Sequence, residues 1–283
     1  MPPPYPPSPE RSAEVRRRFA EEARSERPDL SALCLLIGAE ADGSLDENGI
    51  DAAQLELDRL AGQLPYRPGG PSAWAEALCR VLGGRCGFSG SAGDYERLES
   101  SLLHEVLRRR RGLPILLSVV WLEVARRAGA PVYGVALPGH FVVGFGTAEE
   151  LVLADPFDGG RVLSGTDVDL LVVGATGAPL QPSMLAPATP LQVVQRIVNN
   201  VRAWATARPE RSDVALWAVE LALLLPSHPA RLRYERAQLL VQRGEFVEGA
   251  VELDAYADLV GVVDPHTEER ARAQAREARA LLN

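Results

Sequence analysis

The sequence predicts an α+β protein with N-terminal helices, a middle region built on an antiparallel sheet, and an all-helical C-terminal region. Three observations support this fold class. Apolar residues recur at helical spacing before residue 70, helical patterns give way to short strand-like runs between residues 71 and 186, and only helical patterns follow from residue 187. We therefore expect residues 1–10 to be a disordered proline-rich tail, with the helical, mixed and all-helical regions covering 11–70, 71–186 and 187–283.

The N-terminal region contains three candidate helices. Residues 12–24 are charged and alanine-rich, which favours a helix by propensity. Asp29 or Ser31 is suited to cap a second helix, because short polar side chains accept hydrogen bonds from the first free backbone N–H groups. A third helix follows residues 49–51, and the prolines and glycines of residues 66–72 interrupt the pattern.

Three more helices are expected in the middle region. The first begins near Trp74 and stops at Gly83. The second starts at Ser100 or Ser101 and ends in the arginine run Arg108–Arg111, with Gly112 just beyond it as the C-cap. The third is opened by a proline and covers residues 115–127, which are apolar on nearly all sides, so this helix should be buried.

Strand-like runs follow these helices. The candidates are residues 132–136, 141–145 and 151–154. If Gly146–Glu149 forms the loop between the last two, Phe145 lies opposite Glu150 and His140 lies opposite Asp155. This register predicts a histidine–aspartate pair on neighbouring strands.

The C-terminal region resembles tetratricopeptide repeats. Thr189 is suited to cap its first helix, with Pro190 at the first helical position. Residues 218–229 look like the second half of a helix pair, and residues 233–259 look like a nearly complete repeat. Small residues, notably Ala250, recur where paired helices must approach closely.

The His140–Asp155 pair suggests part of a catalytic triad. In such a site an aspartate orients the imidazole, and a nucleophile sits on its other side. A thiol at the N-terminus of a buried helix suits that role, because the helix dipole stabilises the thiolate. The helix at residues 115–127 is in the expected place for this arrangement.

Several separated motifs resemble one bacterial family. EVLRRRRGLPI, PGHF, DPFDGG, PATPLQVVQRIVNN and RGEFVEGAVE are similar to blocks of the SirB family, in which a transglutaminase-like domain precedes tetratricopeptide-type repeats. The resemblance covers residues 12–283. It implies a Cys–His–Asp triad in which His140 and Asp155 keep their places. The thiol position, counted back from Gly129, falls on Pro114, and the family shares this proline.

Other residues remain candidates around this site. Ser118 lies one turn into the helix and could act as a nucleophile, although a hydroxyl bonded to a carbonyl of its own helix is the simpler interpretation. Cys86 lies in a glycine-rich loop that could cover the site, or it could be a buried thiol without chemistry. His104 and Glu105 could line the same groove as Pro114. The arginines of 108–111 are expected to form a solvated helix end, or alternatively to bind an acidic partner or a phosphate.

Composition narrows the function classes. A net charge of −8 argues against general nucleic-acid binding. The three cysteines and four histidines show neither a disulfide framework nor metal-ligand spacing, so we expect no metal and no cofactor. We find no signal peptide and no membrane-spanning stretch, and expect a cytoplasmic protein.

These observations favour a non-catalytic binding, scaffold or regulatory module that recognises a protein or peptide. In this hypothesis His140 and Asp155 either keep a ligand-binding groove or hold their hairpin in place. The alternative is a peptide-amide hydrolase or transferase that uses His140 and Asp155 with an unusual nucleophile.

Overall fold

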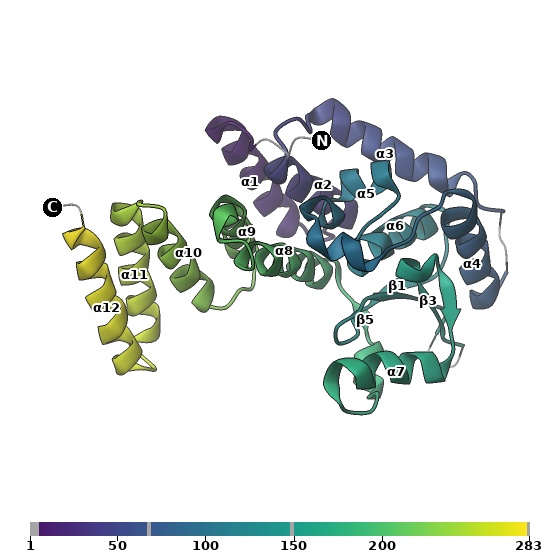
Figure 1. Ribbon diagram of the computed structural model, residues 1–283. Coiled ribbons are helices and arrows are strands. Elements are labelled where there is room, and N and C mark those ends of the chain that lie inside the picture. The colour runs from purple at the N-terminus through teal and green to yellow at the C-terminus, as the bar shows by residue number, and fades with distance from the viewer. Residues whose placement is uncertain (1–5, 67–68, 148–149, 282–283) are drawn as a thin grey trace. The chain divides into compact units, whose positions relative to one another are not determined.

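The computed structural model describes residues 6–66, 69–147 and 150–281, and its chain forms two compact units (Figure 1). The first unit comprises residues 1–18 and 25–197, and the second comprises residues 19–24 and 198–283. The α+β fold class is confirmed, with N-terminal helices, a central antiparallel sheet and C-terminal helices.

Most helices of the first unit precede its sheet. They are α2 (Leu30–Ala41), α3 (Glu47–Ala61), α4 (Pro71–Leu78), α5 (Leu103–Arg109) and α6 (Pro114–Arg127), with α7 (Gly165–Thr176) after the sheet. Two further helices, α1 (Pro9–Ala23) and α8 (Pro190–Thr206), each contribute residues to both units. Asp29 caps α2 by accepting a hydrogen bond from the Ala32 N–H, as its side chain predicts.

The sheet has five antiparallel strands in the order β4-β3-β2-β1-β5. Their bounds are β1 (Val132–Val135), β2 (Val142–Phe145), β3 (Val152–Asp155), β4 (Arg161–Leu163) and β5 (Pro187–Ala188). The first three agree closely with the predicted runs. Sequence periodicity missed β4 and β5, because strands of three and two residues are too short to show an alternating pattern.

Helices cover both faces of this sheet. Figure 1 shows α6 on one side and α7 on the other. On the α7 side, Val168 and Val172 pack in one buried cluster with Val135, Val142 and Leu153 from the strands. On the other side, α6 contacts β1 and β2 and is buried from Pro114 to Ala125. Because α6 is buried along most of its length, its sequence is apolar on nearly all sides.

The predicted beginning of the first helix is wrong. Helix α1 starts at Pro9, inside the expected disordered tail of residues 1–10. Proline is favourable in a first helical turn, because it needs no N–H donor there. The Ser8 hydroxyl also accepts a hydrogen bond from the Arg11 N–H. Residues 1–5 of the predicted tail lie outside the described residues.

Two helix ends in the middle region also differ from prediction. The helix expected to stop at Gly83 continues as a π-helical segment, Cys79–Arg85. The second helix ends at Arg109, and its C-cap is Arg110, which has a left-handed φ of 58°, so the residue that reverses the chain is not Gly112. Gly112 has a packing role instead, because a Cβ there would lie 2.6 Å from a Val106 methyl carbon.

The serines expected to begin the second helix do not cap it. A 3-10 turn covers Leu98–Ser101, and Leu102 occupies the capping position of α5. The Ser100 hydroxyl instead donates to Asp94, and the Ser100 carbonyl accepts from the Leu113 N–H. Ser100 therefore fixes the loops that lead into α6.

The second unit contains the expected helix pairs. They are α9 (Ser212–Leu224), α10 (Arg231–Gln242), α11 (Phe246–Val260) and α12 (Pro265–Ala280). Gly244 has a φ of 84° in the turn between α10 and α11. Ala237, Ala250 and Ala257 are fully buried, so these helices approach closely where the sequence has small side chains.

Candidate functional site

The centre of the candidate site is a histidine–carboxylate pair. His140 Nε2 lies 2.8 Å from Asp155 Oδ2, which is hydrogen-bond distance. Both side chains are largely buried, with 13% and 9% of their surfaces exposed. Asp155 Oδ1 accepts a hydrogen bond from the Phe157 N–H, which fixes the carboxylate. The described residues provide no hydrogen-bond partner for His140 Nδ1, so this nitrogen is free to meet another group.

The predicted strand register is wrong by two residues, although the pair still forms. Phe145 is opposite Val152, where Glu150 was expected. A shift of two residues keeps every side chain on the same face of a sheet, whereas a shift of one would reverse it. His140 lies just before β2, in a turn where its N–H bonds to the Leu137 carbonyl, and its side chain reaches Asp155 at the end of β3.

An aromatic residue connects this pair to the preceding glycine-rich loop. The Phe157 ring lies edge-on to His140, with ring centroids 6.1 Å apart. The Tyr95 ring also lies edge-on to Phe157, with ring centroids 6.1 Å apart. Gly90 donates its N–H to the Phe157 carbonyl, and a Cβ on Gly90 would lie 1.9 Å from the ring. The loop therefore packs against the site because it carries no side chain at Gly90.

Tyr95 has a perturbed environment. Half of its surface is exposed, but burial of the rest raises the pKa of its phenol, and the Asp155 carboxylate raises it further. At neutral pH its hydroxyl is protonated and able to donate a hydrogen bond. Tyr95 is thus a polar group near Asp155 that sequence inspection did not select.

Arg196 in α8 holds the turn that carries His140. Its Nη2 donates to the carbonyls of Leu137 and His140, both at 2.7 Å. Its guanidinium also lies over the Phe141 ring, 5.7 Å from the centroid. Burial lowers the pKa of Arg196, but a guanidinium is so strongly basic that the side chain stays charged. Sequence reasoning did not select Arg196. The feature that could have identified it is its position as a cation within the PATPLQVVQRIVNN motif, on a helix with many apolar residues.

Helix α6 is hydrogen-bonded, near its beginning, to the residue that follows His140. Pro114 is buried at the first position of α6 and has no side-chain nucleophile. One turn later, the fully buried Ser118 hydroxyl donates to the Phe141 carbonyl at 3.2 Å. The acceptor is thus on the residue after His140, and the expected bond to a carbonyl of its own helix is not the contact that forms.

Cys86, the cysteine considered as a nucleophile, contacts the segment after α3. The Cys86 thiol is partly buried, and its Sγ lies 3.8 Å from Gln63 Oε1. Cys86 therefore belongs to the glycine-rich loop, as expected, but its described hydrogen bond is to the segment after α3.

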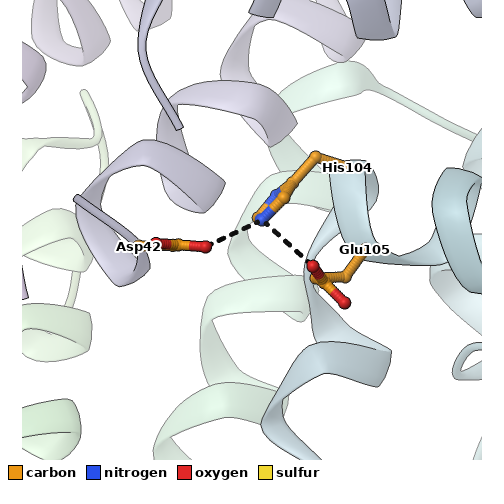
Figure 2. Close-up of side chains that lie close together, drawn as sticks. All are labelled: Asp42, His104 and Glu105. Carbon is orange, nitrogen blue, oxygen red and sulfur yellow. Dashed lines mark ion pairs between the residues drawn. The ribbon is translucent and has the colours of Figure 1, made fainter. Parts of the chain in front are cut away.

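His104 and Glu105, predicted to line the same groove, are brought together with Asp42. Figure 2 shows these three side chains converging from the end of α2 and the first turn of α5. Their described ionic contacts are with each other and Arg108, and His140 is not among them.

The arginine run is paired within the chain. Arg108 contacts Glu105, Arg109 lies 3.8 Å from Asp94, and Arg110 contacts Glu56. Arg111 donates to the Ser89 hydroxyl at 2.8 Å. Arg108 and Arg111 are exposed, as expected for a solvated helix end, and all four arginines also have partners within the chain that tie this segment to its neighbours.

Two family models match the chain. A model described as the transglutaminase-like superfamily matches residues 51–199, and a tetratricopeptide-repeat model matches residues 201–283. The chain belongs to the transglutaminase-like superfamily. The more specific resemblance to the bacterial SirB-type family, with its C-terminal repeats, is also confirmed.

Relatives in bacteria and in mammals are similar to parts of this chain. A UPF0162 protein of Xylella fastidiosa (strain 9a5c) is 31% identical over 81% of this chain and 83% of its own. A UPF0162 protein of Vibrio cholerae is 28% identical over 66% of this chain and 71% of its own. F-box only protein 21 of Mus musculus is 26% identical over 56% of this chain, which is 26% of that protein.

Within the described part of the chain, no helix has both the length and the apolar character that a membrane crossing requires.

Proposed function

We propose that this protein is a non-catalytic binding module, in which the His140–Asp155 pair persists without a nucleophile. The observation that carries the proposal is Pro114 at the first position of α6, where the resemblance places the thiol. The Ser118 hydroxyl is engaged by the Phe141 carbonyl and the Cys86 thiol by Gln63. Neither side chain hydrogen-bonds the imidazole among the described contacts.

The tetratricopeptide region supports a protein or peptide partner. Its repeats are an interaction architecture, and helix pairs of this kind form concave binding surfaces. The second unit carries a groove of about 630 Å³ between α8, α9 and α10. Arg202, Arg208 and Arg231 line this groove together with Glu235, so positive side chains outnumber negative ones. We assign the partner to this groove, with a preference for acidic segments.

A second candidate is amide hydrolysis or acyl transfer. The observation that favours it is the intact 2.8 Å contact to Asp155, together with the free Nδ1 of His140. An imidazole held in this way acts as a general base when a nucleophile comes within reach.

Chemical labelling separates the two candidates. The reduced protein is treated with iodoacetamide, or with a fluorophosphonate that captures reactive serines, and its intact mass is measured. Burial raises the pKa of the Cys34 thiol well above its usual range, so Cys34 should react slowest. We expect Cys79 and Cys86 to alkylate at ordinary rates, equal in the wild type and in His140→Ala, and no serine adduct to form.

The matched control is His266→Ala, which removes an exposed histidine from the second unit. A single fast, stoichiometric adduct that disappears in His140→Ala but persists in His266→Ala contradicts the non-catalytic proposal and supports the hydrolase.

A further inference from the structure

A second cluster of chemically active side chains lies in the first unit, formed by Asp42, His104 and Glu105. Asp42 directly follows α2, whereas the other two begin α5, and the packing of α2 against α5 brings them together (Figure 2). His104 Nε2 lies 3.7 Å from Asp42 Oδ2 and 3.9 Å from Glu105 Oε1. One ligand atom from each residue lies within 4.8 Å of the other two.

His104 is the unusual member of this cluster. Only 11% of its side-chain surface is exposed, both ring nitrogens are fully buried, and neither has a hydrogen-bond partner among the described residues. Buried polar atoms in folded proteins nearly always have partners, so this imidazole is short of one. Its Nδ1 side is packed against Gly38, where a Cβ would lie only 2.5 Å from that nitrogen. The other side, with Nε2, faces the two carboxylates.

The geometry of the imidazole suits a metal ligand. A neutral imidazole has a lone pair to give to a metal. The distances to the carboxylates exceed hydrogen-bond length, so a direct bond does not already use that lone pair.

We propose that Asp42, His104 and Glu105 bind a divalent transition-metal ion, of which Zn²⁺ is the representative. Metal–ligand bonds of about 2.0–2.2 Å place tetrahedral ligands roughly 3.3–3.6 Å apart. The two separations from His104 Nε2, 3.7 and 3.9 Å, need to shorten by only a few tenths of an ångström, and the ligand atoms of Asp42 and Glu105 lie within 4.8 Å of each other. Such a set is a borderline nitrogen and oxygen environment that suits Zn²⁺ better than Mg²⁺ or Ca²⁺.

The surrounding contacts keep the carboxylates in place. Asp42 Oδ1 accepts hydrogen bonds from the Ser44 N–H and hydroxyl, which leaves Oδ2 toward His104. Glu105 is paired with Arg108 and is buried. Three protein ligands leave a fourth position for water or a small anion. The ion would link the end of α2 to the start of α5, two helices between which the chain forms α3 and α4.

The site is distinct from the proposed binding function, because it shares no residue with the His140–Asp155 pair or with the residues that line the groove of the second unit. The composition of the ligand set also explains why the spacing of histidines and cysteines in the sequence did not indicate a metal site. The ligands come from distant segments, and two of the three are carboxylates, which are too common to stand out in a sequence.

Calorimetric titration of the metal-free full-length protein with Zn²⁺ tests this proposal. Binding is compared for the wild type, Asp42→Asn, His104→Ala and the control His266→Ala, with the free thiols alkylated beforehand so that they do not compete. We expect one site in the wild type and in His266→Ala, with at least about tenfold weaker binding in the two ligand variants. Thermal unfolding should show the same pattern, with Zn²⁺ raising the melting temperature only where the site is intact.

Asp42→Asn keeps the acceptor for Ser44 and removes one negative ligand, so it tests the site even if His104→Ala unfolds. Equal Zn²⁺ affinity in the wild type and Asp42→Asn overturns the proposal. So does the absence of stoichiometric binding by the folded wild-type protein.

Discussion

At the scale of single residues, Arg196 is hydrogen-bonded to the turn that carries His140. His140 lies in a turn before β2, and two of the carbonyls in that turn accept hydrogen bonds from one buried guanidinium. Hydrogen bonds from charged donors contribute more than neutral ones, and a buried carbonyl that loses its donor is costly. Arg196 is therefore a positioning residue for the His140–Asp155 pair.

Replacing Arg196 with alanine should destabilise the protein by about 2 kcal/mol, because both carbonyls lose their partner. Urea unfolding measures this change, and the NMR resonances of the His140 ring should move with it. Arg161→Ala is the control. Arg161 forms exposed ion pairs with Asp158 and Asp167, so its loss should cost no more than about 0.5 kcal/mol. An Arg196→Ala protein as stable as Arg161→Ala, with unchanged His140 resonances, contradicts the positioning role.

At the scale of elements, the helix that runs on through Gly83 and Gly84 shows how glycine can permit packing where a break is expected. A Cβ on Gly83 would lie 1.8 Å from the Gly159 carbonyl oxygen, whereas a Cβ on Gly84 would lie 3.8 Å from its nearest neighbour, the Cys79 carbonyl oxygen. Gly83 thus lets the π-helical segment touch the turn after Asp155. Gly84 has no such contact.

This pair of glycines gives a matched test. Gly83→Ala should lower the free energy of unfolding by at least about 2 kcal/mol, since a backbone oxygen must move away. Gly84→Ala should be near neutral or slightly stabilising, because alanine restricts the unfolded chain. Both are measured by chemical denaturation. Equal stability of the two variants would show that the close approach of Gly83 to Gly159 is not a constraint.

Local sequence signals predicted some of these elements well. Asp29 as a cap, Pro114 as the start of α6 and the all-apolar character of that helix depend on neighbouring residues alone. The errors arise where a tertiary contact decides, as for Ser100, which bonds Asp94 rather than capping α5, and for Arg110, which takes a left-handed conformation and pairs with Glu56.

At the scale of the whole molecule, the pattern of helical and strand-like runs predicted the fold class, and the assumed strand register predicted the pairing of His140 with Asp155, although that register is wrong by two residues. Sequence order could not show that Ser118 binds the Phe141 carbonyl, that Arg196 holds the same turn, or that Asp42 meets His104. Each of these contacts joins segments far apart in the chain. They appear only once helices and sheet are packed.

The central claim is that His140 and Asp155 form an intact acid–base pair whose nucleophile position is occupied by Pro114. Pro114→Cys tests it by restoring the missing group at the beginning of α6. The helix N-terminus should lower the pKa of the new thiol, and the account predicts that the His140 imidazole lowers it further.

The measurement is the rate at which iodoacetamide alkylates the introduced thiol at pH 6, followed by peptide mass spectrometry in Pro114→Cys and in Pro114→Cys with His140→Ala. We expect the introduced thiol to react at least about tenfold faster than Cys86, because more of it is thiolate at that pH, and to lose this advantage when His140 is removed. An introduced thiol that reacts no faster than Cys86, or equally fast without His140, contradicts the claim.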